Sequence, residues 1–287
     1  MTGSPGLLVM PAWKAAGWSL AFLVLGMALT IVLLIPAGAV FPLGFEAPLQ
    51  AALVQAACML LAFGVATWFI GLRVLRLTPG DLRWSTPREG GRGFMVGFLL
   101  GGVPAIVALG AGALLSSAGW RLDGGGVVEW LGVAALTGSI LLPAAFAEEV
   151  IFRGVPLVLL AVALGRWVAG PLLAGLFALA HLANPGVTVL ALGNIAMAGV
   201  FLTACFYLPG GLWTATGAHL GWNLSLAALA APVSGLPLAM PMLDYVAGGP
   251  AWLTGSGFGP EGGVVATAVL LMATVLVARR IPRERVS

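Results

Sequence analysis

The sequence predicts an all-α fold, a polytopic membrane bundle of about eight transmembrane helices. Of its 287 residues, 60% are hydrophobic and 8% are charged, whereas about 25% are charged in an ordinary soluble domain. So few charges cannot cover a water-exposed surface. The 42 glycines and 19 prolines are tolerated in membrane bundles, where small residues let helices approach and neighbours satisfy the backbone groups that proline frees. Composition therefore predicts a protein solvated largely by lipid.

Apolar runs of span length recur from one end of the chain to the other. A span needs about 20 mostly apolar residues. The first run exceeds the roughly 7–15 apolar residues of a signal peptide, so we expect it to remain as a span. The predicted spans cover residues 16–37, 49–72, 94–118, 130–160, 167–184, 187–208, 211–231 and 263–280.

We expect the chain to be organised in three parts. Residues 1–129 hold about three N-terminal spans and a basic cytoplasmic loop at 73–93, and residues 130–231 hold a core of four spans. Residues 232–287 comprise a Gly/Pro-rich segment, the last span and a basic tail. The segment 232–262 is expected to be irregular or re-entrant at the membrane interface.

Arginines gather in one loop and at the end of the chain. Basic residues flank spans on the cytoplasmic side, so we expect both termini to be cytoplasmic, in the plasma membrane. The net charge of +3 comes without a dense basic cluster, which argues against nucleic acid as a partner. The two groups are Arg73, Arg76, Arg83, Arg88 and Arg92 in the loop, and Arg279, Arg280, Arg283 and Arg285 in the tail.

One predicted span, with the sequence AFAEEVIFRG, carries two acids and one base. Charged groups inside spans are costly and mostly functional. Glu149 and Arg153 are four residues apart and share a helix face, so they can form an ion pair. Glu148 is rotated by about 100° from Glu149, which leaves it free to act as a general base in a low-dielectric pocket. A purely structural role is the alternative, in which the ion pair and a protonated Glu148 hold two helices together.

The only two histidines also lie in predicted spans. His181 ends FALAH, and His219 begins HLGWN, where Asn223 follows four residues later on the same face. Glu149 and His181 are equally far from residue 165, where an apolar run is interrupted. If that interruption is the turn of a helical hairpin, we expect the two side chains at similar depth.

Two chemistries fit these groups. Glu148 or Glu149, with His181 and His219, can bind Zn²⁺ or another divalent metal and leave a fourth position for water. Alternatively, no metal is bound, and a glutamate and a histidine activate water while His219 and Asn223 donate hydrogen bonds to an oxyanion. The HExxH pattern of zincins is absent, and the sequence does not decide between the two chemistries.

The three motifs together resemble the CPBP intramembrane proteases, also called the Abi or type II CAAX prenyl endopeptidase family. EEVIFR is similar to that family's Glu-Glu-x-x-x-Arg motif, FALAH to Phe-x-x-x-His and HLGWN to His-x-x-x-Asn, in family order over about residues 130–231. The resemblance implies that Glu148, Glu149 and His181 handle the nucleophilic water. It also implies that His219 and Asn223 assist by metal binding or by oxyanion stabilisation.

We therefore expect an intramembrane endopeptidase that cuts a membrane-bound or lipidated protein or peptide. The main alternative is a non-catalytic regulatory or scaffolding membrane protein that keeps the motifs for helix packing. Transport, with the Glu and His groups as a proton relay, predicts inverted repeats, and no repeat is obvious in the sequence.

Overall fold

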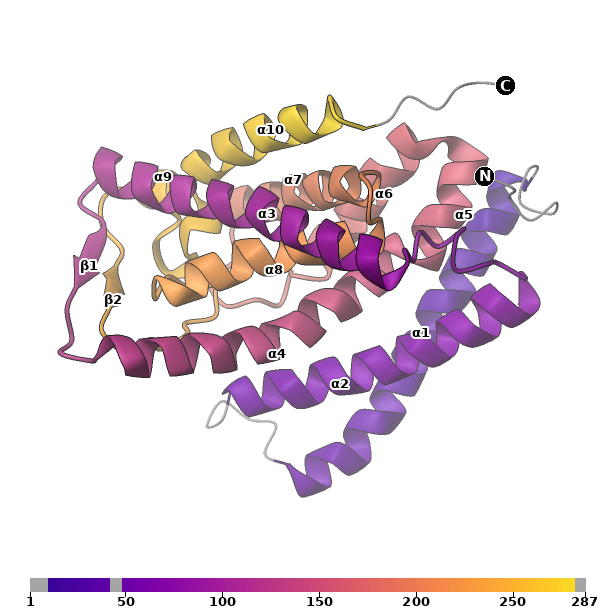
Figure 1. Ribbon diagram of the computed structural model, residues 1–287, viewed down its shortest axis with the longest axis horizontal. Helices are drawn as coiled ribbons and strands as arrows, with labels where there is room; N and C mark the ends of the chain where they lie inside the picture. The colour runs from indigo at the N-terminus through magenta and orange to yellow at the C-terminus, as the bar shows by residue number, and fades with distance from the viewer. Residues whose placement is uncertain (1–9, 42–47, 282–287) are drawn as a thin grey trace.

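The computed structural model describes residues 10–41 and 48–281, which are nearly all helical (Figure 1). The long and medium helices are α1 (Ala12–Val40), α2 (Pro48–Ala66), α3 (Pro87–Leu115), α4 (Val127–Arg153), α5 (Val155–Leu164), α6 (Arg166–Leu179), α7 (Val189–Phe206), α8 (Leu212–Ala228) and α10 (Val264–Ala278). The short elements are the π-helical η1 (Thr67–Val74), α9 (Ala251–Thr254), the 3₁₀ helices η2 (Ser256–Phe258) and η3 (Pro260–Gly262), and the antiparallel pair β1 (Gly119–Arg121) and β2 (Asp244–Val246). Arg283 and Arg285 of the predicted tail lie outside the described residues.

The all-α prediction is confirmed, with differences in where helices end. Among the described residues, four helices are long and apolar enough to cross a membrane, at 12–40, 50–74, 87–115 and 189–206. The predicted span 130–160 is two helices, because Pro156 has no N–H to bond the preceding turn and the chain changes direction after Arg153. The predicted span 167–184 is also too long, since α6 ends at Leu179.

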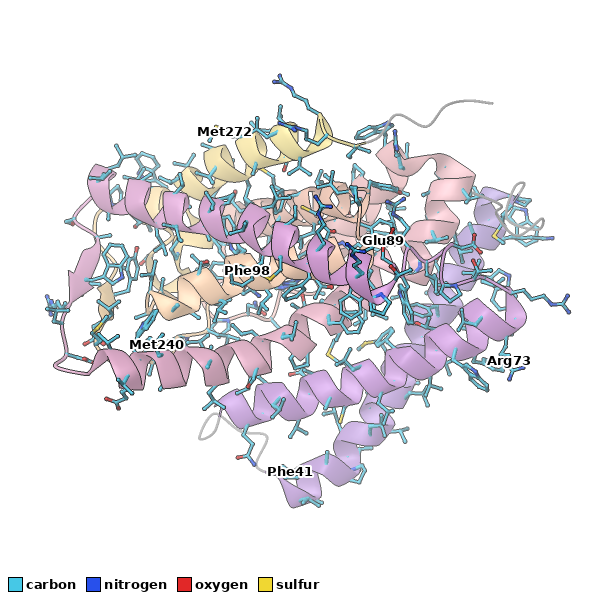
Figure 2. All side chains as sticks on the ribbon, in the orientation of Figure 1. Phe41, Arg73, Glu89, Phe98, Met240 and Met272 are labelled. Carbon is cyan, nitrogen blue, oxygen red and sulfur yellow. The ribbon has the colours of Figure 1, made fainter. Side chains whose placement is uncertain are left out.

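The charged segments separate to opposite ends of the bundle. Figure 1 shows the starts of α1 and α3 and the α5–α6 turn toward one end, and β1, β2 and α9 at the other. Arg73 and Met240 mark these two ends in Figure 2. Arg83 and Arg166 both lie over the ring of Tyr207, so the basic loop before α3 meets the turn between α5 and α6. We call this the basic end; it holds Arg73, Arg83, Arg92, Arg166 and Arg280.

Helix α8 is the centre of the bundle. It packs against α3, α4 and α7, and residues 214–222 are all buried. Glycines make the α3–α8 contact close: a Cβ added at Gly101 would overlap the carbonyl oxygen of Ala218, and one at Gly217 that of Phe94. Small residues at four-residue spacing let membrane helices approach in this way. The close contact fixes the position of α8, which carries His219 and Asn223.

The outward faces of the helices are apolar. Leu20 and Ile35 on α1, Leu99 on α3 and Leu271 on α10 expose more than half of their surface. Since soluble proteins rarely expose large contiguous apolar surfaces, these faces suit contact with lipid. Polar side chains are instead collected around α8.

We expect Gly101→Ala to destabilise the bundle and Gly110→Ala to leave it intact. The new methyl group at residue 101 meets the backbone of α8, and such overpacking costs about 1–3 kcal/mol. A Cβ at Gly110, on the same helix, has no neighbour within 4 Å. Apparent unfolding temperatures of the purified proteins in detergent measure the difference. Equal temperatures for the two variants would contradict the close α3–α8 packing.

Candidate functional site

The centre of the site is a fully buried ion pair on α4. The Arg153 Nη1 atom lies 3.1 Å from Oε1 of Glu149, and the two side chains are 1% and 0% exposed. Arg153 also donates from Nη2 to the carbonyl of Gly199 on α7 at 2.9 Å. Its guanidinium lies 4.8 Å from the centre of the Phe177 ring. The charge of Glu149 is thus neutralised, and α4 is tied to α6 and α7.

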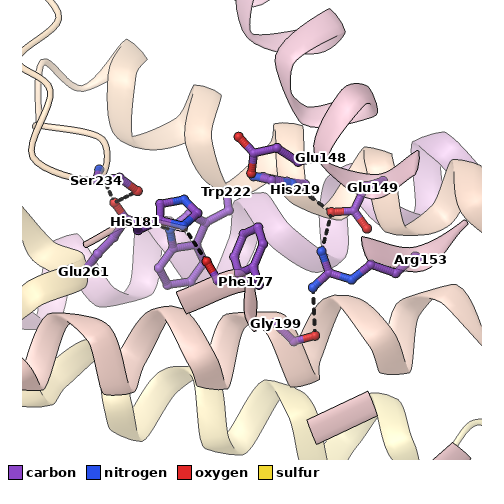
Figure 3. Close-up of polar contacts among 10 residues, drawn as sticks. All are labelled: Glu148, Glu149, Arg153, Phe177, His181, Gly199, His219, Trp222, Ser234 and Glu261. Carbon is purple, nitrogen blue, oxygen red and sulfur yellow. Dashed lines mark hydrogen bonds and ion pairs between the residues drawn. The ribbon is translucent and has the colours of Figure 1, made fainter. Parts of the chain in front are cut away.

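His219 reaches the same carboxylate from α8 (Figure 3). Its Nδ1 lies 2.9 Å from Oε1 of Glu149, so this oxygen is shared by Arg153 and His219. Its Nε2 lies 3.8 Å from Oε2 of Glu148, which is too long for a direct hydrogen bond. His219 therefore lies between the two glutamates, held by one and facing the other.

Glu148 and Glu149 are consecutive, yet they have different environments. Glu149 has no exposed surface, whereas the side chain of Glu148 is 28% exposed. Within the described residues, Oε2 of each of the two glutamates is buried and accepts no hydrogen bond. The 100° rotation between neighbouring helix positions predicts this separation, with Arg153 serving one carboxylate only.

Among the described residues, no direct interaction joins His181 to Glu148 or Glu149, and the similar depth expected from the hairpin stays a prediction. It belongs to the turn that follows α6, and its Nδ1 lies 2.7 Å from the carbonyl oxygen of Phe177. Because a carbonyl only accepts, Nδ1 carries a proton and is the donor in this hydrogen bond. The Phe177 ring lies 4.7 Å from the His181 ring and 6.0 Å from the His219 ring. The two imidazoles therefore lie on either side of Phe177.

Asn223 lies one turn beyond His219 on α8 and is partly exposed. No hydrogen bond of its side chain occurs among the described residues, so both its amide hydrogens and its oxygen are available to a bound molecule. Of the predicted site residues, the structure joins Glu148, Glu149, Arg153 and His219 by direct interactions. His181 and Asn223 adjoin this group without bonding to it.

A second buried acid, Glu261 in η3, lies beside His181 (Figure 3). Oε1 of Glu261 accepts from the Trp222 indole at 3.0 Å, and Oε2 accepts from the backbone N–H and the hydroxyl of Ser234. Asn194 on α7 donates to the carbonyls of Glu261 and Gly263. Burial raises the pKa of the Glu261 carboxyl, while the hydrogen bonds from Ser234 and Trp222 and the charge of His181 act to lower it.

The sequence pattern did not single out Glu261, which appears there only as an acidic residue of the irregular 232–262 segment. The one available signal is an acid within the Gly-rich run GFGPEGG. In the structure, Glu261 connects the segment to α8 by accepting a hydrogen bond from Trp222, three residues after His219. The 232–262 segment is thereby part of the wall around the site.

The predicted metal ligands do not converge. Oε1 of Glu149 already accepts from Arg153 and His219, and His181 bonds to the Phe177 carbonyl instead of facing them. Over residues 10–41 and 48–281, no three His, Cys, Asp or Glu side chains are grouped so as to hold a metal ion. The side chains present therefore do not fit the three-ligand Zn²⁺ site that the sequence left open.

Comparison with known proteins supports the resemblance seen in the motifs. Residues 130–225, about a third of the chain, match the model of the type II CAAX prenyl endopeptidase Rce1-like family. The matched region runs from α4 into α8 and contains Glu148, Glu149, His181, His219 and Asn223. No curated protein and no solved structure matches the chain.

We expect Arg153→Met to destabilise the protein strongly. The substitution leaves the buried Glu149 carboxylate without its guanidinium, and breaking such a pair costs about 3–5 kcal/mol. Arg121→Met, at an exposed position of β1, is the matched control and should change little. Thermal unfolding in detergent compares the two, and a wild-type unfolding temperature for Arg153→Met would contradict the role assigned to the pair.

We expect Glu261→Ala to loosen the 232–262 segment. Three donor groups on Trp222 and Ser234 lose their acceptor, at a cost of about 1–3 kcal/mol for each group left buried and unpaired. Hydrogen exchange of peptides from this segment should accelerate. Asp244→Ala removes an exposed carboxylate from the same segment and should leave exchange unchanged; equal acceleration in both variants would refute the anchoring role.

Proposed function

We propose that this protein is an intramembrane endopeptidase that hydrolyses a peptide bond in a membrane-associated or lipidated protein. The observation that carries the proposal is the 3.8 Å approach of Glu148 to His219, beside a second glutamate that Arg153 has neutralised. One carboxylate is thus structural, and the other is partly exposed and able to take a proton. The prenyl endopeptidase family matched by residues 130–225 supports a lipid-modified substrate.

In the proposed reaction, Glu148 acts as the general base. Its carboxylate accepts a proton from a water molecule, and the water oxygen bonds to the carbonyl carbon of the scissile peptide. The Glu148 side chain is partly exposed, whereas Glu149 is fully buried and paired with Arg153, which supports this role. His219, whose Nδ1 is held by Glu149, presents its Nε2 edge to the same space.

The developing negative charge on the peptide oxygen needs donors placed in advance. We propose that His219 and Asn223 supply them, because they lie one turn apart on the same face of the buried helix α8. Since Nδ1 of His219 donates to Glu149, Nε2 acts as a donor in the doubly protonated ring. The tetrahedral intermediate then breaks its C–N bond, and the leaving amine takes the proton from Glu148. Glu149 and Arg153 act only as positioning residues, since they hold the imidazole ring without facing the water.

We assign no step to a metal ion, because no three His, Cys, Asp or Glu side chains are grouped so as to hold one over residues 10–41 and 48–281. Cleavage should accordingly persist in the presence of chelators. Loss of activity on chelation, with recovery on adding Zn²⁺, would instead favour the metal-dependent chemistry.

We also propose that the basic end faces the cytoplasm, with both termini on that side of the plasma membrane. The support is the separation of charge in the fold: arginines gather at one end, while Asp123, Glu129 and Asp244 line a hollow at the other. Positively charged segments are retained on the cytoplasmic side during insertion.

We expect Glu148→Gln to abolish cleavage of a lipidated peptide by the purified protein in liposomes. Loss of a general base typically lowers the rate about 10²–10⁴-fold, whereas the isosteric amide preserves packing. Glu129→Gln is the control, since it makes the same change at an exposed position in the first turn of the same helix. Unfolding temperatures of both variants should equal that of the wild type.

Two outcomes would overturn the assignment. Full activity of Glu148→Gln would remove Glu148 as the base. Absence of cleavage by the wild type, across lipidated and unmodified membrane-anchored peptides, would favour the non-catalytic regulatory or scaffolding alternative. Comparing the termini of membrane proteins in cells that carry the wild type or Glu148→Gln would then identify the substrate class.

A further inference from the structure

A cavity of about 1240 Å³ opens at the basic end, and no glutamate or histidine of the candidate site lines it. It lies between the first turns of α3 and the last turn of α10, and residues 208–211, which join α7 to α8, form part of its wall. Figure 2 shows Glu89 on the first turns of α3. Nothing in the proposed hydrolysis uses this cavity.

The cavity has a net positive lining that comes from three separate segments. Arg83 precedes α3, Arg92 lies on α3 and Arg280 follows α10, whereas Glu89 is the one acid among the lining residues. Arg83 is held in place, since its guanidinium donates to the carbonyls of residues 206–208 at the end of α7. Arg92 and Arg280 are exposed. Three guanidinium groups facing one space favour an anion.

The two helices that line the cavity, α3 and α10, have the same order of side chains from the end of the bundle toward its middle. On α3, Val96 and Leu100 follow Arg92 at four-residue steps, so they lie about 6 Å and 12 Å deeper into the bundle. On α10, Leu276 and Val277 lie about one turn deeper than Arg280. Each wall therefore presents a cation at the end of the bundle and aliphatic surface toward its middle.

We propose that this cavity binds an anionic phospholipid. The phosphate would contact Arg92 and Arg280, whose planar guanidinium groups suit phosphate oxygens, and the upper part of an acyl chain would cover Val96, Leu100 and Leu276. A soluble anion would satisfy the arginines but would leave the aliphatic walls uncovered. The order of charge and apolar surface along both helices therefore favours a lipid.

Binding can be tested on the full-length protein in neutral detergent, with phosphatidylglycerol as the probe. We expect phosphatidylglycerol to raise the apparent unfolding temperature by several degrees, as a ligand of the folded state does, and phosphatidylcholine to do so much less. The double variant Arg92→Gln/Arg280→Gln should bind phosphatidylglycerol at least about tenfold more weakly, because each basic residue near an anionic lipid contributes on the order of a fivefold gain.

The matched control is Arg88→Gln, an exposed arginine in the first turn of α3 that does not line the cavity. It should keep wild-type affinity, and equal weakening in this variant would reduce the effect to general charge attraction and overturn the proposal. Two further results would also overturn it: equal stabilisation by phosphatidylcholine, or equal stabilisation by inorganic phosphate or glycerol phosphate, which would indicate a soluble-anion site.

Discussion

The burial of the Glu149 carboxylate is the constraint on which the rest of the site depends. A carboxylate without exposed surface is stable only when it is paired and hydrogen-bonded, and here one oxygen accepts from both Arg153 and His219. Because Arg153 also bonds to the Gly199 carbonyl, one negative charge joins α4, α7 and α8. The placement of His219 is therefore an electrostatic requirement as well as a result of packing.

Because the buried Glu149 carboxylate must be paired, the two consecutive glutamates differ in their surroundings. Glu149 is buried and holds Arg153 and His219 in position, whereas the side chain of Glu148 is partly exposed. In the proposed hydrolysis, the group that takes the proton therefore need not also hold the fold together. His181 and Glu261 form a second polar group on the far side of Phe177, and they connect the 232–262 segment to the same region.

The surrounding helices separate these polar groups from the lipid. Lipid offers no hydrogen bonds, so the polar side chains gather around α8, and the outward faces are left to aliphatic residues. Close glycine contacts between α3 and α8 allow a central helix that carries His219 and Asn223 with little exposed surface. The charges that remain lie at the two ends, and three arginines of the basic end line the cavity that we propose binds a lipid headgroup.

The sequence by itself determined the membrane character, the helical class, the pairing of Glu149 with Arg153 and the family that residues 130–225 match. These features depend on composition or on spacing within a few residues, where helix geometry alone sets which side chains meet. Only the tertiary structure decided that His219, 70 residues from Glu149, is its partner, while His181 bonds to its own helix end. It alone brought Glu261 beside His181. Contacts of this kind depend on how separate helices pack, which no local pattern in the chain encodes.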